Sequence, residues 1–309
     1  MNPSNAVDLT APPSEPWPQG DLRQGAASWR NWIGPAISLA VLIAAIAQLR
    51  HLDVTRAASL VPSRPLFWAA LAGAYMALPL SEWLIYRRLW KLPASGILPL
   101  LRKRISNEIL LGYSGEVYFY AWARRHVGMT GAPFGVIKDV AILSAQIGNI
   151  VTLLLAAVAW PLLGPLHLGA HTRDLILSSA LVVLMSMPVL LFRTKLLTLP
   201  APELWQIALT HFVRVVAGLL LTAAMWHEAL PAVAWTWWLM LAALRQLLSR
   251  LPLMPNKDVA FAGLAAYLIG PRTDIVAMAA MTASLILALH LALGAMLALA
   301  DLATPGESV

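Results

Sequence analysis

Cysteine is absent from the 309-residue sequence, and charged residues are scarce at 12%. Without cysteine the chain can form no disulfide, no thiolate zinc site and no cysteine nucleophile. Soluble globular proteins are about 25% charged and about 45–50% apolar, whereas this chain is 59% apolar and has a mean hydropathy of +0.70. So much apolar surface does not fit inside one water-soluble core. The composition therefore argues against a soluble enzyme, a disordered protein and a nucleic-acid-binding domain.

The formal net charge of +7 fits a membrane protein, in which lysine and arginine collect in cytoplasmic loops and set orientation. A helix needs roughly 17–25 mostly apolar residues to cross about 30 Å of hydrocarbon. Seven stretches of the sequence qualify as spans: residues 32–49, 66–86, 141–163, 175–192, 205–226, 232–248 and 275–300. Two further stretches, 109–121 and 259–269, are too short or too polar to cross, which predicts re-entrant or interfacial segments.

These stretches predict an all-α fold, a polytopic membrane helical bundle of about seven spans plus two re-entrant or interfacial helical segments. We expect residues 1–30 to be a disordered cytoplasmic tail, 31–301 to form a single transmembrane domain, and 302–309 to be a short polar tail. With the N-terminus inside, most lysines and arginines lie on inside segments, above all between residues 87 and 138. This bias predicts a multi-pass protein of the cytoplasmic (inner) membrane, with a cytoplasmic N-terminus and an outside C-terminus.

Charged residues within a membrane are costly, so each marks a candidate site. The first group lies around the stretch 109–121, where a Ser-Gly turn would place Glu116 inside the membrane. Glu116 would need a cationic partner there, and arginine is the natural one. The other candidates of this group are Asn107, Arg124 and Arg125. The alternative is an amphipathic surface helix with ordinary lipid contacts.

Two more candidate groups lie within predicted spans. Asp139, Gln146 and Asn149 share one helical face, which indicates either hydrogen bonds between helices or a polar path for a substrate. His211 and Arg214 are spaced i and i+3. They could form an interior ion pair or bind a lipid phosphate, unless Arg214 extends to the membrane boundary.

A fourth group flanks a helix break at two prolines, Pro252 and Pro255. It consists of Arg245, Arg250, Lys257 and Asp258. The helix that follows the break would present its N-terminus to an anion such as phosphate, or the run would simply be solvated. The sequence contains no zinc-binding His-Glu-x-x-His and no Gly-rich phosphate loop, so we expect no metal site and no cofactor.

The motifs S-N-E at 106–108, G-Y-S-G-E at 112–116 and Y-A-W-A-R-R at 120–125 resemble the central signature of a flippase-like membrane family. This family is related to the transmembrane region of lysylphosphatidylglycerol synthases. The stretch 137–144 is similar to the family's next helix. The resemblance implies a helical membrane fold over about residues 32–300 and a role in moving lipid. The soluble aminoacyl-transfer domain of the larger synthases has no counterpart here, so lipid aminoacylation is not expected.

Together these features predict a protein that translocates, or helps translocate, an anionic lipid or lipid-linked amphiphile across the cytoplasmic membrane. Arginines would hold the phosphate, while Glu116 and Asp139 would limit its affinity or couple a proton. The expected partners are an anionic lipid head group and a second copy or an envelope-biosynthesis protein, with no nucleic acid. One alternative is a non-transporting subunit that scaffolds an envelope lipid or polysaccharide synthesis complex. Another is a lipid-modifying membrane enzyme with Glu116 as general base, although we expect no enzymatic activity.

Overall fold

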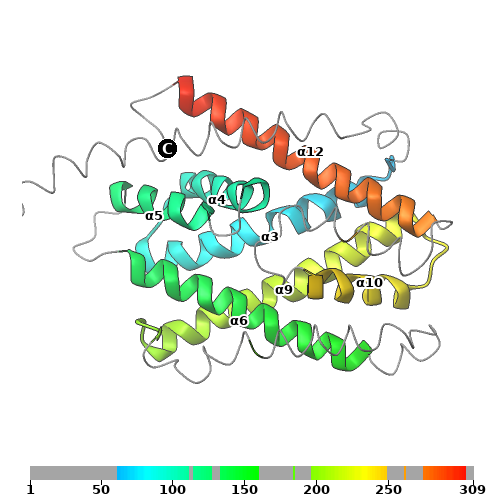
Figure 1. The fold of residues 1–309 in the computed structure, drawn as a ribbon, viewed down its shortest axis with the longest axis horizontal. Coiled ribbons are helices and arrows are strands. Elements are labelled where there is room, and N and C mark those ends of the chain that lie inside the picture. Colours follow the sequence, from blue (N-terminus) through cyan, green and yellow to red (C-terminus); the bar gives the residue numbers. More distant parts are fainter. Residues whose placement is uncertain are drawn as a thin grey trace, which may run out of the picture.

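The computed structural model describes residues 61–110, 114–126, 133–159, 184, 196–248, 261 and 274–303. All regular elements in these ranges are helices, which confirms the all-α fold class (Figure 1). They are α3 (Pro65–Trp90), the short 3-10 helix η1 (Ala94–Gly96), α4 (Ile97–Ile109), α5 (Ser114–His126), α6 (Phe134–Ala159), α9 (Ala201–Ala229), α10 (Trp235–Leu248) and α12 (Asp274–Ala303).

Prolines mark the ends of the two helices at the centre of the bundle. Helix α3 has Pro65 in its first turn, where the missing N–H of proline costs nothing. It ends where Lys91 adopts a left-handed conformation with φ 54°. Helix α9 likewise has Pro202 in its first turn and stops at Ala229, shortly before Pro231. These two helices pack along each other, and α6 and α10 pack on α9.

Three described helices are long and apolar enough to cross a membrane, over Phe134–Leu155, Ala201–Ala229 and Ala277–Ala300. They correspond to the predicted spans 141–163, 205–226 and 275–300. Such helices expose large apolar side chains, among them Leu209, Phe212 and Leu299. An apolar outer surface of this kind belongs in lipid. The structure thus defines a helical membrane protein.

The predicted number of seven spans is not confirmed. Helix α3 covers the predicted span 66–86 but is not among the three, and it carries charged residues towards its end. Helix α10 has 14 residues, about 21 Å in length, which is short for a membrane crossing. The predicted spans 32–49 and 175–192, the segment 259–269 and both tails lie outside the described residues, apart from Leu184, Phe261 and the last helical residues of α12.

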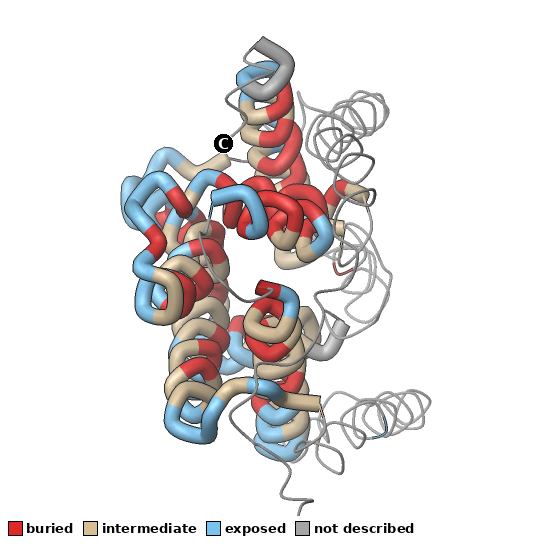
Figure 2. The backbone as a smooth tube through the Cα atoms, turned by 90° about the vertical axis from the view of Figure 1, so that its left-hand side faces the viewer, coloured by how far each residue is buried: buried red, intermediate tan, exposed pale blue. Residues whose placement is uncertain are grey.

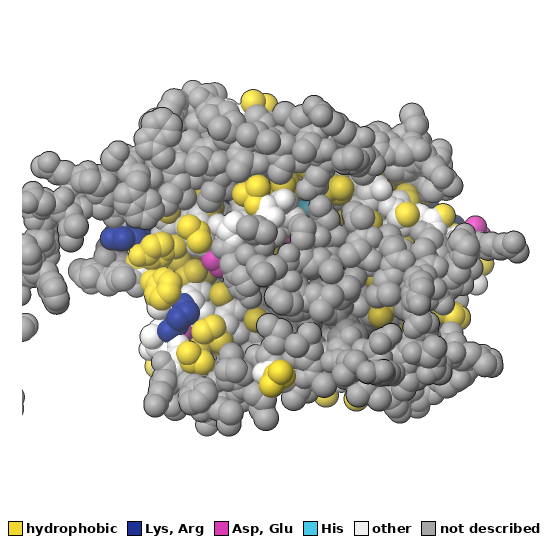
Figure 3. All heavy atoms as spheres, in the orientation of Figure 1, with side chains coloured by type: hydrophobic (Ala, Val, Ile, Leu, Met, Phe, Trp, Pro, Cys, Tyr) yellow, Lys and Arg dark blue, Asp and Glu magenta, His cyan; other side chains and the backbone are white. Residues whose placement is uncertain are grey.

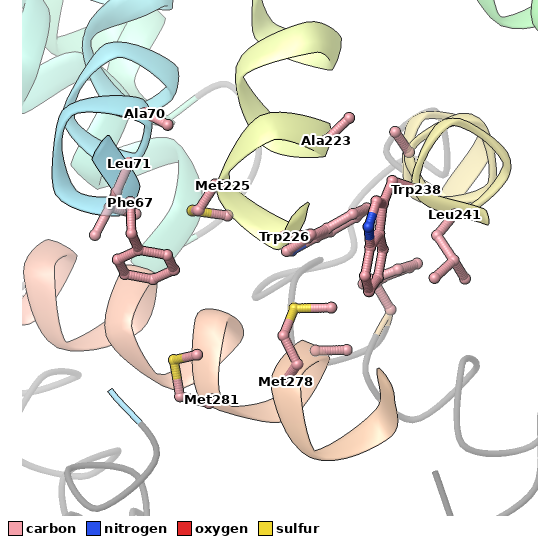
Figure 4. Packing of buried hydrophobic residues seen from close by; sticks show 13 residues of the cluster. Phe67, Ala70, Leu71, Ala223, Met225, Trp226, Trp238, Leu241, Met278 and Met281 are labelled. Carbon is pink, nitrogen blue, oxygen red and sulfur yellow. The ribbon is translucent and has the colours of Figure 1, made fainter. Parts of the chain in front are cut away.

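Helix α12 runs in the opposite direction to the one predicted. Its first turns pack in one apolar cluster with the start of α3 and the end of α9 (Figure 4). Met278 and Met281 lie there with Phe67 and Trp226. In the predicted topology the spans cross the membrane in alternate directions from a cytoplasmic N-terminus. The span 275–300 would then begin on the side where the span 66–86 ends. That prediction is wrong because it followed the arginines before residue 274, whereas apolar contacts fix the helix start at the other end.

A second apolar cluster joins the end of α3 to α4, α5 and α6. Its largest fully buried side chains are Tyr86, Tyr118 and Phe119. Figure 2 shows buried residues on the faces that the helices turn toward one another, with exposed residues on the outer faces. The end of α3 is therefore held in a packed environment rather than in a surface loop.

The predicted hairpin over 109–121 has a different geometry. Helix α4 ends at Ile109 and α5 begins at Ser114, so Ser114 and Gly115 open the second helix instead of forming the tip of a turn. The Ser114 hydroxyl donates to the Ser106 carbonyl oxygen at 2.8 Å, and the Gly115 N–H donates to Asn107 Oδ1 at 2.7 Å. The second bond satisfies an N–H group that the first turn of a helix leaves free, and the first ties α5 to a carbonyl oxygen near the end of α4.

Candidate functional site

Helix α4 carries three consecutive cations that leave it on different faces and bind different partners. Successive residues of a helix are about 100° apart, so each side chain leaves on its own face. Arg102 donates to the Tyr118 hydroxyl and to the Leu297 carbonyl oxygen, each at 2.9 Å. Arg104 donates to the Tyr75 carbonyl oxygen, and its guanidinium lies 4.4 Å from the centre of the Tyr75 ring. Helix α4 thereby contacts α5 and α12 through Arg102 and α3 through Arg104.

The middle cation, Lys103, is shared by two carboxylates. Its Nζ lies 2.6 Å from Glu82 Oε1 on α3 and 3.4 Å from Glu116 Oε1 on α5. The side chains of Lys103 and Glu82 are only 3% and 5% exposed, whereas that of Glu116 is 21% exposed. Three ionised groups from three helices therefore meet in the interior.

Lys103 stays protonated in this position. Burial lowers the pKa of Lys103, but the nearby Glu82, Tyr86 and Glu116 outweigh it and raise the pKa above its usual value. A buried ion pair is held together only when the attraction between its charges compensates for the lost hydration. Two carboxylates around one ammonium supply that attraction.

Two polar atoms beside Lys103 make no hydrogen bond within the part of the chain that the structure describes. They are the Tyr86 hydroxyl and Glu116 Oε2. Tyr86 is fully buried and interacts electrostatically with Lys103 and both carboxylates. Buried polar groups normally have a partner, so these two atoms are available to a water molecule, a proton or a ligand.

Helix α9 brings His211 and Arg214 to the same place. His211 is fully buried and lies close enough to Arg214 and Lys103 for both charges to act on it, with the Val140 backbone nearby. Neither of its ring nitrogens has a hydrogen bond of good geometry among the described residues. Arg214 Nη2 donates to the Ser144 hydroxyl on α6 at 3.2 Å.

We call Glu82, Tyr86, Lys103, Glu116, His211 and Arg214 the ion cluster. It draws side chains from α3, α4, α5 and α9, while α6 borders it through Ser144. Three of the predicted site residues, Glu116, His211 and Arg214, belong to it. The expected cationic partner of Glu116 was an arginine, and this prediction is wrong, because Glu116 pairs with Lys103. Arg102 also reaches α5, but it donates to the Tyr118 hydroxyl.

Other predicted site residues near α5 have different roles. Asn107 accepts the bond from Gly115 and so caps α5. Arg124 and Arg125 are exposed in the last turn of α5. Arg124 Nη1 donates to the Tyr120 hydroxyl at 3.3 Å, and Arg125 Nε donates to the Ala121 carbonyl oxygen at 3.4 Å. These two arginines therefore lie on the exposed surface of α5, in contrast to the buried Lys103.

Asp139 stabilises the chain before α9 instead of facing the ion cluster. Its Oδ2 accepts hydrogen bonds from the Thr198 N–H, the Thr198 hydroxyl and the Leu199 N–H, at 2.7–2.8 Å. Its other oxygen lies 3.5 Å from Lys138 Nζ. On the same helix, Gln146 is buried and Asn149 half-buried. Asp139 thus acts as a structural anchor between α6 and α9.

Of the fourth predicted group only Arg245 is described, and it lies away from the ion cluster. Arg245 lines a small cavity with Thr222, Trp226 and Thr282, of a size that holds about one water molecule. Trp226 follows His211 on α9 by about 22 Å at 1.5 Å per residue, so this cavity is a separate place. Arg250, Lys257 and Asp258 lie outside the described residues. Among the described residues, no three His, Asp or Glu side chains gather in a way that could hold a metal ion.

Sequence reasoning missed Glu82, Tyr86 and Lys103. A signal was available for Glu82, because it is an acidic residue inside the predicted span 66–86 and such residues are costly there. Lys103 gave no separate signal, since it stands in the basic run 102–104 that is equally typical of a membrane surface. Only the packing of α4 between α3 and α5 distinguishes it.

Fold and site together define a helical membrane protein with an ion cluster in its interior. Comparisons of the chain with protein families, with curated proteins and with solved structures gave no match.

Proposed function

We propose that this protein moves, or helps move, an anionic lipid or lipid-linked amphiphile across the cytoplasmic membrane, as its resemblance to the flippase-like family implies. The observation that carries the proposal is the ion cluster, in which Lys103 holds two carboxylates and Glu116 Oε2 is left without a hydrogen bond among the described residues.

The energetic cost of this arrangement supports a functional role. An ionised side chain at the centre of a membrane helix costs about 2.5–3.5 kcal/mol on insertion scales. Replacing a buried ion pair by apolar residues is often neutral or stabilising. A bundle that served only as a scaffold could be held together by apolar packing at this place without ionised groups. In the ion cluster charged residues pair across helices, yet Glu116 Oε2 has no hydrogen bond among the described residues. Such an arrangement suits a site in which a ligand can replace one member of an ion pair.

The cations at one end of the bundle support an anionic ligand. Exposed basic residues lie where α3 and α5 end: Arg87, Arg88, Lys91, Arg124 and Arg125. Figure 3 shows Lys and Arg beside hydrophobic side chains at the corresponding end of one face. Each basic residue near an anionic membrane surface contributes about 1 kcal/mol of attraction. We propose that this end is cytoplasmic, following the distribution of lysine and arginine.

We further propose that α3 is a crossing in addition to the three apolar helices. Its 26 residues extend for about 39 Å, enough to cover a hydrocarbon layer of about 30 Å. Its charged residues lie at the proposed cytoplasmic end or, in the case of Glu82, in the ion cluster. This assignment places Glu82 and Lys103 within reach of a head group that enters from the cytoplasmic side.

A second candidate function is a non-transporting subunit of an envelope lipid or polysaccharide synthesis complex. The observation that favours it is the role of α4, whose Arg102 and Arg104 bond α12, α5 and α3 together. In that function the ion cluster would only hold the helices in place.

Reconstitution separates the two functions. Purified protein in liposomes of phosphatidylcholine with a trace of fluorescent phosphatidylglycerol should make the inner-leaflet label accessible to an external quencher. We expect Glu116→Gln to slow this exchange about tenfold, equivalent to ~1.4 kcal/mol in the barrier. Glu203→Gln, in the first turn of α9, is the matched control. Full exchange by Glu116→Gln would remove the site, and no exchange by the unmodified protein would favour the scaffold.

A further inference from the structure

Three ionised groups meet at Lys103. Glu82 and Glu116 are negative and Lys103 is positive, so the charges of these three groups sum to −1. In an interior of low effective dielectric an uncompensated charge is expensive. An anionic head group that joined these three groups without a proton would double their excess negative charge. Binding of an anion there therefore requires the simultaneous gain of a positive charge or loss of a negative one.

Glu116 is the carboxylate best placed to lose its charge. It lies 3.4 Å from Lys103, whereas Glu82 lies 2.6 Å away. Its side chain is 21% exposed against 5% for Glu82, so water can reach it more easily. Its Oε2 makes no hydrogen bond among the described residues. A protonated carboxyl group at this oxygen would become a hydrogen-bond donor.

We propose that Glu116 takes up a proton whenever an anionic head group binds at Lys103, so that the proton and the anion bind together. This inference rests on the proposed function and names its coupling ion. A proton from water adds to the Glu116 carboxylate, and Lys103 keeps its pair with Glu82. The ammonium face released by Glu116 then binds a phosphate oxygen. With a monoanionic head group the net charge of these groups is unchanged, and both charges leave together on release.

The groups around Glu116 are consistent with this exchange. Glu116 pairs with Lys103 of α4. The Tyr86 hydroxyl and Glu82, both on α3, interact with the same lysine. On α9, His211 lies close enough to Lys103 and Arg214 for both charges to act on it. The charged residues of α6 are engaged elsewhere, since Lys138 and Asp139 pair with each other and Asp139 binds Thr198. The remaining charged residues of its own helix, Arg124, Arg125 and His126, lie in the last turn of α5.

Proton uptake can be measured with the full chain in phosphatidylcholine nanodiscs. Dioctanoyl phosphatidylglycerol is the probe, titrated calorimetrically in two buffers of different ionisation enthalpy near pH 7. We expect about one proton taken up per bound lipid, and an affinity that falls about tenfold per pH unit as the pH rises. Glu116→Gln, which mimics the protonated side chain, should bind the lipid without proton uptake. Glu203→Gln should behave like the unmodified protein.

The outcomes separate this inference from the proposed function. Lipid binding without proton uptake by the unmodified protein, equal uptake by Glu116→Gln, or no binding at all would each overturn the inference. The measurement on the unmodified protein decides the matter even if Glu116→Gln fails to fold. Proton-linked binding in a protein that exchanges no lipid between leaflets supports the inference and overturns only the proposed transport. Lipid exchange without proton-linked binding supports the proposed transport and overturns this inference.

Discussion

Gly115 lies against the carbonyl oxygen of Lys103, so close that a β-carbon at position 115 would overlap it. The same β-carbon would lie 2.9 Å from Asn107 Oδ1. Because the obstacle is backbone of α4, it cannot rotate away as a side chain could. The close approach of α4 and α5 therefore depends on the absence of a side chain at Gly115. The distance between Glu116 and Lys103 depends on it as well.

We therefore expect Gly115→Ala to destabilise the fold by about 1–3 kcal/mol, the usual cost of overpacking. Thermal unfolding in mild detergent measures the loss. Gly218→Ala on α9 is the matched control, because its added β-carbon would meet nothing within 4 Å. Alanine is favoured over glycine within a helix by roughly 0.5–1 kcal/mol, so the control should be neutral or stabilising. Equal melting temperatures for the two variants would contradict the close approach.

Lys103→Met should be the most damaging single change in the ion cluster. It leaves Glu82 and Glu116 buried without their cation, and breaking a buried pair in this way costs about 3–5 kcal/mol. Denaturant titration in mixed micelles measures the loss. Glu82→Gln alone should cost less, because Lys103 keeps Glu116.

The double variant Glu82→Gln/Lys103→Met should lose less stability than the two single changes added together. It removes one of the two unpaired carboxylates that Lys103→Met creates, and the effects of substitutions at residues in contact are not additive. Strict additivity would show that the two side chains do not form the pair described.

Asp139→Asn tests the structural role of a residue that the sequence indicated as a substrate ligand. Asparagine keeps the shape but loses the charge that accepts three hydrogen bonds from Thr198 and Leu199. We expect a loss of about 1–3 kcal/mol, as for an impaired buried hydrogen-bond acceptor. Lipid exchange per folded molecule should be unchanged.

Thr198→Val is the companion variant, since it removes one of those three bonds and should cost about 1 kcal/mol. If Asp139→Asn kept its stability but lost lipid exchange, Asp139 would belong to the transport path after all.

Arg124→Gln/Arg125→Gln should leave the stability within about 0.5 kcal/mol, as exposed substitutions usually do. Association with vesicles containing phosphatidylglycerol should weaken by about 1 kcal/mol per charge at low salt, which flotation assays can measure. Arg102→Gln is the contrasting change, because it breaks the bonds to Tyr118 and Leu297 and should destabilise the protein. Similar behaviour of both variants would contradict the division between exposed and buried arginines.

The sequence was informative about helices and less so about their paths. The lengths of the apolar stretches predict the helices around 141–163, 205–226 and 275–300. The hydrophobicity of a segment indicates by itself whether that segment can lie in lipid. The direction of α12 could not be predicted, since it depends on which apolar surfaces Met278 and Met281 meet. Lysine and arginine counts favoured the other direction.

Among the candidate site residues, the sequence singles out Glu116, His211 and Arg214 because each is a polar or charged residue within a predicted apolar stretch. Asp139 has the same signature but bonds to the segment before α9, and Asn107 caps α5. The cost of burial identifies a polar residue as noteworthy, but it does not tell a ligand from a structural anchor.

The amino-acid sequence by itself indicates a helical membrane protein, because hydrophobicity and helix length are properties of single segments. Tertiary structure alone decides that Lys103, rather than either neighbouring arginine, joins Glu82 and Glu116. That choice rests on the angle at which α4 meets α3 and α5, and a rotation of about 100° would present a different cation. Long-range packing sets this angle.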